Sequence, residues 1–144
     1  HLSIRRQRQM CIRDSYLFDA LYGEVDAFRD WVLAAKDKRG RDRHKLISHY
    51  VGGRVREHNL ALMRALSNKG VDCLSETRPG SLSRAEITSA RVVFLQSAVT
   101  HGEITHLQNN LRDCLFASCL RRQLSSGWFK EKDAPRVIEI RRDS

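Results

Sequence analysis

Arg43 and His49 are the side chains whose types and spacing best suit chemistry on a phosphodiester. An arginine stabilises negative charge that builds up on phosphate oxygens, and a histidine gives or takes a proton near neutral pH. The surrounding stretch is rich in basic residues, so the same spacing also fits a solvated basic loop followed by a histidine on a helix surface. The leading interpretation therefore assigns no catalytic residue, and the pair is kept as an alternative.

Metal-binding patterns are incomplete in this sequence. Glu103 and His106 have the Glu-x-x-His spacing that aligns two ligands on one helical turn, but a di-iron site needs a second such pair. Cys114 and Cys119 lack the Cys-x-x-Cys spacing of a structural zinc site, and both fit an apolar helix face. We expect no metal and no cofactor. A sensing role for the two cysteines stays open.

Basic and hydroxyl side chains in the last part of the chain could contact nucleic acid. An exposed helix face would offer serine hydroxyls and arginines to base edges and phosphates, and a following hairpin would offer further cations to the backbone. The candidate nucleic-acid-binding residues are Ser118, Arg121, Arg122, Ser125, Lys130, Lys132 and Arg136. These side chains act together only if the elements that carry them form a suitable scaffold.

Hydrophobic periodicity predicts a mainly α protein. Apolar residues step by three or four over residues 17–36 and again over 46–66, where Gly52 and Gly53 mark either a bend or a break between two helices. Residues 71–74 are expected to form a short strand and 75–82 a linker, with the domain boundary at 71–82.

Further helices are expected after this boundary. Ser83 and Glu86 form a capping box that opens a helix reaching to about residue 98, and residues 103–124 form one helix or two. Two strand-like segments, 128–130 and 137–140, predict a C-terminal β-hairpin.

The order of elements after residue 82 resembles the winged helix-turn-helix family, and in particular regulators of MarR-like and ArsR-like type. The resemblance lies in Leu82-Ser83-Arg84-Ala85-Glu86, in His101-Gly102-Glu103-Ile104-Thr105, and in the stretch from Leu120 to Phe129. It departs from the family in the spacing of Leu120, Leu124 and Gly127. The resemblance implies a transcriptional regulator that binds duplex DNA as a homodimer, with residues 16–70 packing on residues 83–144 or forming the dimer interface.

Two other functions remain open. The arginine and histidine first described resemble the catalytic pair of the helical HEPN ribonucleases, which would make Arg43 and His49 catalytic in an RNA-cleaving toxin domain. The chain could also be a non-enzymatic interaction fragment of a larger phage or plasmid protein.

Residues 1–15 resemble the translated read-through of a sequencing-library adapter, and we expect them to be non-native. Excluding them removes four arginines and one aspartate from a 144-residue chain whose formal net charge is +9. The remainder is still basic, which favours anionic partners. Three cysteines remain, without close pairs, and no apolar run reaches membrane-spanning length, so we expect a cytoplasmic protein that does not enter a membrane.

Overall fold

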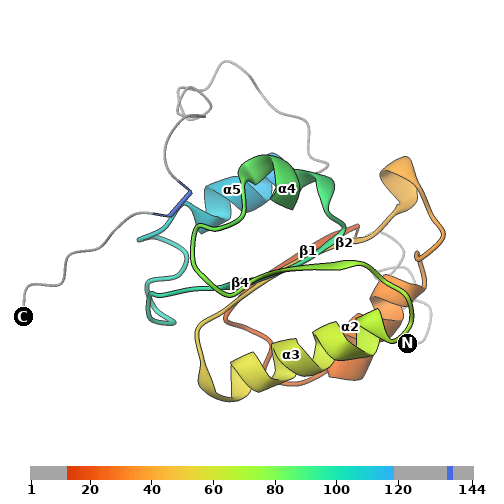
Figure 1. Cartoon of the computed structure of the whole chain (residues 1–144), viewed down its shortest axis with the longest axis horizontal. Coiled ribbons are helices and arrows are strands. Elements are labelled where there is room, and N and C mark those ends of the chain that lie inside the picture. Colours follow the sequence, from red (N-terminus) through yellow and green to blue (C-terminus); the bar gives the residue numbers. More distant parts are fainter. Residues whose placement is uncertain (1–12, 119–135, 138–144) are drawn as a thin grey trace, which may run out of the picture.

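A computed structural model describes residues 13–118 and 136–137 of the chain. Its centre is a sheet of four parallel strands in the order β1-β2-β4-β3 (Figure 1). The strands are β1 (Asp14–Phe18), β2 (Lys45–Tyr50), β3 (Cys73–Glu76) and β4 (Val92–Gln96). Asp14 and Ser15, the last residues of the segment expected to be non-native, pair with Lys45 and Leu46 in this sheet.

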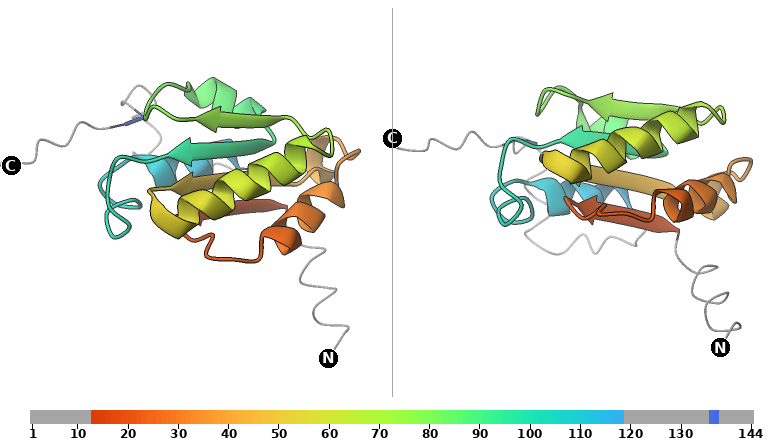
Figure 2. Two further views of the ribbon diagram at one scale, coloured as in Figure 1. Left: turned by 60° about the horizontal axis from the view of Figure 1, so that its bottom comes forward. Right: turned by 90° about the horizontal axis from the view of Figure 1, so that it is seen from below.

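Helices cover both faces of the sheet (Figure 2). One face carries α2 (Val25–Leu33) and α3 (Gly53–Ser67), and a short 3-10 helix, η1 (Gly40–Asp42), lies between α2 and β2 in the chain. The other face carries α4 (Arg84–Ser89) and α5 (Asn110–Ala117). Each face has its own apolar core: Tyr50 and Phe94 belong to the core under α2 and α3, and Ile47 and Val93 to the other. The domain is therefore a three-layer α/β/α structure.

β2 and β4 occupy the two central positions, which explains their composition. Every residue of β2 and the first four residues of β4 are buried. A parallel strand with helices on both faces has no solvent-facing side, and β4 accordingly is a nearly continuous apolar run, whereas β2 buries Lys45, Ser48 and His49 among its apolar residues. The hydrophobic pattern of such a strand does not reveal that it is a strand.

The mainly α prediction is wrong because three predicted helical stretches each contain a strand. The stretch 17–36 holds the end of β1 and then α2, and 46–66 holds β2 and α3, which meet at Gly52 and Gly53. The stretch 83–98 holds α4 and β4. Two expectations are confirmed: a short strand near residues 71–74, which the structure extends as β3 to Glu76, and the capping box of Ser83 and Glu86.

The winged helix-turn-helix prediction is also wrong, because its first helix is interrupted by a central strand of a parallel sheet. α4 ends at Ser89, and β4 pairs with β2 and β3 on its two sides. Residues 101–107 form turns rather than a helix, although Glu103 accepts hydrogen bonds from both the amide and the hydroxyl of Thr100. The predicted hairpin falls outside the described residues, apart from Arg136 and Val137.

Lys45 links the sheet to α4 through buried polar contacts. Its side chain is 4% exposed, and its Nζ donates hydrogen bonds to the carbonyl oxygens of Ile87, Thr88 and Ala90 at 2.7, 2.8 and 2.7 Å. Carbonyl groups at a helix C-terminus lack partners within the helix, and a cation satisfies them. Among the described residues, the helices are too short or too polar to cross a membrane.

Candidate active site at the carboxyl edge of the sheet

The central strands β2 and β4 lead to opposite faces of the sheet. The chain leaves β2 to enter α3, whereas it leaves β4 by the loop that leads to α5 on the other face (Figure 1). In open parallel sheets, ligands bind at the carboxyl ends of adjacent strands whose connections diverge in this way. The topology therefore directs attention to the turn after β2, the loop after β4 and the residues beside them.

Asp19 is the buried carboxylate at this edge. It directly follows β1, and its backbone is left-handed, with a φ of 51° that is uncommon for a residue other than glycine. Its amide donates to the carbonyl of His49 at 2.8 Å, and its Oδ1 accepts a hydrogen bond from the amide of Val51 at 2.9 Å. The side chain is 9% exposed. These contacts fix the carboxylate against the end of β2.

His101 contacts the second oxygen of the same carboxylate. Its Nδ1 lies 3.1 Å from Asp19 Oδ2, and the side chain is 62% exposed. Because a carboxylate accepts hydrogen bonds, Nδ1 carries the proton, and in the neutral ring Nε2 then holds the free lone pair. Tyr22, which is 61% exposed, places its hydroxyl 3.3 Å from Nδ1 and its ring edge-on to the imidazole. His101 is therefore a solvent-exposed histidine whose ring is oriented by the buried carboxylate of Asp19.

The turn from β2 into α3 brings main-chain amides to the same edge. Gly52 is extended and Gly53 has a φ of 56°, a left-handed value that glycine adopts at little cost. A Cβ added to either glycine would meet no atom within 4 Å. α3 has no side-chain cap and no acidic residue in its first turn. The first amides of a helix carry partial positive charge and favour an anionic group placed near them.

His49 lies close to this edge but has a different environment. It is 3% exposed and stacks on Phe18, with ring centroids 5.1 Å apart and planes at 18°. Burial, together with the nearby Arg136 guanidinium, lowers its pKa to about 3. Arg136 itself pairs with the buried carboxylate of Glu76 and donates to the carbonyl of Leu82. His49 is therefore a neutral core residue rather than an acid or base that a substrate could reach.

The structure separates the pair on which the ribonuclease alternative rests. Arg43 precedes β2 at its amino end, where it donates to the carbonyl of Ser89, while His49 lies near the carboxyl end of the same strand. Neither residue is on a helix, so the prediction of a helical ribonuclease is wrong for the same reason as the mainly α fold. His58 is partly buried, with its Nδ1 3.1 Å from the carbonyl oxygen of Leu21.

Two of the predicted nucleic-acid-binding residues are among the described residues. Ser118 follows α5 and donates its hydroxyl to the carbonyl of Leu115, and Arg136 makes the ion pair with Glu76. The others lie outside the described residues: Arg121, Arg122, Ser125, Lys130 and Lys132. Because the helix-turn-helix is not formed, the predicted DNA-binding regulator is withdrawn, and the homodimer inferred from that family loses its basis.

The fold and the site together define a parallel α/β domain of the Rossmann-like or flavodoxin-like kind, with a histidine–carboxylate pair at its carboxyl edge. No family model, curated protein or solved structure matches the chain. Within residues 13–118 and 136–137, no three His, Cys, Asp or Glu side chains gather as they would around a metal ion.

Sequence reasoning missed all three side chains of this site. Asp19 and Tyr22 were placed inside one predicted helix, and His101 in a segment of the predicted winged helix-turn-helix. One usable signal was the pair Gly52 and Gly53 between an apolar run and an amphipathic pattern, which is typical of a strand-to-helix turn in α/β proteins. The pairing of Asp19 with His101 has no local signal.

Proposed function

We propose that this domain is a hydrolytic enzyme in which His101, oriented by Asp19, acts as general base and then as general acid on an ester. The observation that carries the proposal is the position of one carboxylate. Asp19 accepts hydrogen bonds from both the imidazole and the β2–α3 turn, at the point where the strand connections diverge. Proton transfer by a positioned histidine typically accelerates a reaction by about 10²- to 10⁴-fold.

The chemistry follows from the tautomer. Nε2 of His101 takes a proton from a water molecule, and the oxygen of that water attacks the electrophilic centre of the ester. Negative charge develops on the ester oxygens, where the uncapped amides at the start of α3 would stabilise it. His101 then returns the proton to the departing alcohol oxygen. Asp19 keeps the ring in place and stabilises its charged form without taking the proton.

Tyr22 supports a substrate with an organic body beside the ester. Its ring is one of the two large apolar side chains that stand exposed among the described residues, and it adjoins the imidazole. An exposed aromatic ring beside polar groups is a common contact for the planar or apolar part of a ligand. Within the described part of the chain, Cys73 and Cys114 are free thiols, which supports a reducing compartment such as the cytoplasm.

The test uses the full chain and two chromogenic substrates, p-nitrophenyl acetate and p-nitrophenyl phosphate. Release of p-nitrophenolate is measured for the wild type, for His101→Gln and for the matched control His106→Gln, which removes an exposed imidazole from the same loop. We expect His101→Gln to lose about 100-fold or more in kcat/KM on the preferred ester while His106→Gln keeps it. Equal activity of the two variants, or no turnover of either ester, would overturn the proposal.

A further inference from the structure

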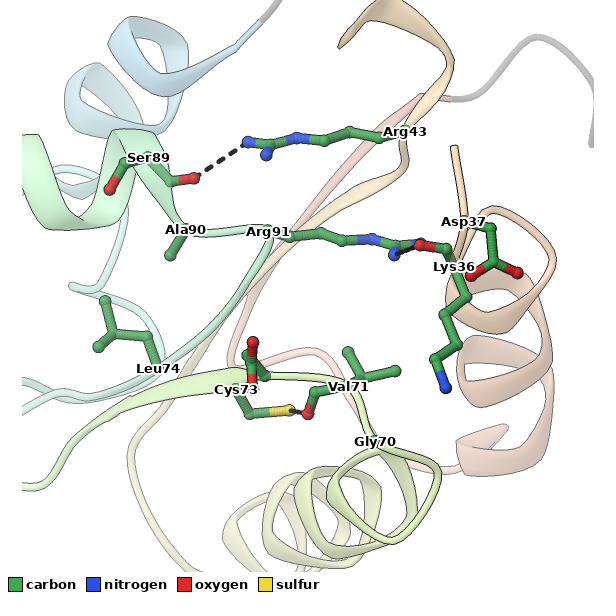
Figure 3. Close-up of a pocket in the computed structure, with 11 residues that line it drawn as sticks. Lys36, Asp37, Arg43, Gly70, Val71, Cys73, Leu74, Ser89, Ala90 and Arg91 are labelled. Carbon is green, nitrogen blue, oxygen red and sulfur yellow. Dashed lines mark hydrogen bonds between the residues drawn. The ribbon is translucent and has the colours of Figure 1, made fainter. Parts of the chain in front are cut away.

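A cavity of about 510 Å³ opens at the amino edge of the sheet, whereas the histidine–carboxylate pair lies at the carboxyl edge. Its walls, drawn in Figure 3, come from the turn after α2, from the start of β3, and from the residues that precede β2, β3 and β4. Pockets of about 300 to 1,000 Å³ are typical of sites for small organic molecules. The proposed hydrolytic mechanism makes no use of this cavity.

Three cations line the cavity, and their hydrogen bonds end on main-chain carbonyls rather than carboxylates. Arg91 donates to the carbonyls of Val32, Lys36 and His44, and so forms a fixed wall. Lys36 Nζ donates to the carbonyl of Lys69 at 2.5 Å. Arg43 donates to the carbonyl of Ser89 at 3.1 Å, which is its one side-chain hydrogen bond within the described part of the chain. Its guanidinium therefore has N–H groups to offer a ligand.

The positive charges are close enough to act on one another. Burial and then the charge of Arg43 lower the pKa of Arg91, and Asp37 opposes this shift. Asp37 and Asp72, both exposed, also line the cavity, so its three cations face two carboxylates and leave one positive charge in excess. An anion placed between the arginines would relieve their repulsion.

The facing wall of the cavity is largely apolar. It is formed by Val71, Cys73 and Leu74, which lead into and begin β3. Cys73 points its sulfur at the carbonyl of Val71, 3.6 Å away, as Figure 3 shows, and burial raises the pKa of this thiol. The thiol is therefore neutral and adds to the apolar surface.

We propose that this cavity binds a small organic anion, with its phosphate or carboxylate group held by Arg43 and its apolar body against Val71, Cys73 and Leu74. An arginine fork is suited to the paired oxygens of such a group. The site lies at the opposite edge of the sheet from His101, so it is a separate binding site rather than part of the hydrolytic one.

The experiment titrates ¹⁵N-labelled full chain with phenyl phosphate at constant ionic strength and follows amide chemical shifts. Inorganic phosphate and phenol serve as the two halves of the probe. Three variants are compared with the wild type: Arg43→Gln, Arg43→Lys and the control Arg78→Gln, which removes an exposed arginine after the opposite end of β3. Unchanged shifts in β4 show that each variant is folded.

We expect phenyl phosphate to shift the amides of residues 70–74 and 89–91, with a Kd of about 1 mM or tighter. Arg43→Gln should weaken binding about tenfold or more, Arg43→Lys less, and Arg78→Gln not at all. Both halves of the probe should bind more weakly than the whole. Binding of phenol or inorganic phosphate as tight as that of phenyl phosphate would overturn the proposal, as would wild-type affinity in Arg43→Gln or the absence of shifts at this edge.

Discussion

His49 is a buried neutral histidine, and its replacement by leucine is expected to make the fold less sensitive to acid. In the native protein, the groups that face its ring are Phe18, Asn110 and Arg136. Burial is the largest cause that lowers its pKa, from 6.5 to about 3, and the Arg136 charge acts in the same direction. In the unfolded chain the ring is solvated and returns to its ordinary pKa.

This difference fixes the sign and the size of the effect. As the pH falls from 6.5 toward 3, the unfolded chain binds a proton that the folded chain does not, so the free energy of unfolding falls. One extra proton in the unfolded state corresponds to about 1.4 kcal/mol per pH unit. His49 alone should therefore cost the folded state about 3 kcal/mol by about pH 4.

The assay is urea denaturation followed by circular dichroism at several pH values between 7 and 4. Carboxylates also titrate in this range, so the informative quantity is the difference between wild type and His49→Leu, with His106→Gln as the exposed-histidine control. We expect the variant's unfolding free energy to fall less steeply with acidification, by close to one proton's contribution. Parallel curves for wild type and His49→Leu would refute the assignment of a neutral buried ring.

Three further changes test the packing of the domain. Lys45→Met removes three hydrogen bonds to carbonyls at the end of α4, and it should lower the unfolding free energy by about 2–4 kcal/mol in urea titrations at neutral pH. Burial and the Arg43 charge lower the pKa of Lys45 to about 8. Between pH 8 and pH 10.5 the unfolded chain still holds the Lys45 proton and the folded chain does not, so the wild type's free energy of unfolding should rise with pH in this range. Lys45→Met should show no such rise. Ser83→Ala removes the hydroxyl that accepts from the amide of Glu86 and should cost about 1 kcal/mol, whereas a change below a few tenths would mean that the cap does not stabilise α4. Phe94→Ala, in the core under α2 and α3, should cost about 3–5 kcal/mol by the same measurement, and a smaller loss would contradict a close-packed central strand.

Features that depend on a few neighbouring residues were predictable from the sequence. Whether the segments at the centre of the fold are strands or helices was not. The capping box of Ser83 and Glu86 acts within one turn, so its hydrogen bonds depend on little beyond those residues. β2 runs directly into the turn before α3, and together they give apolar residues at helical spacing from Leu46 through Val55. A buried strand followed by a helix has the same pattern as one long bent helix.

The run from Val92 to Leu95 shows which features would have distinguished a buried strand from part of a long helix. It is short, rich in β-branched and aromatic residues, and buried on both faces of the sheet, as a central parallel strand must be. The candidate site depends on this strand, because the loop after it carries His101. Asp19 and His101 are 82 residues apart, and only the order of the strands brings them together.

The tautomer of His101 tests the central claim most directly. Asp19→Asn would keep one oxygen for the amide of Val51 and turn its NH₂ group toward Nδ1, which would force the ring to carry its proton on Nε2. Imidazole ¹⁵N shifts of the neutral ring should therefore show the Nδ1–H tautomer in the wild type and the Nε2–H tautomer in Asp19→Asn. An Nε2–H ring in the wild type, or the same tautomer in both proteins, would contradict the account.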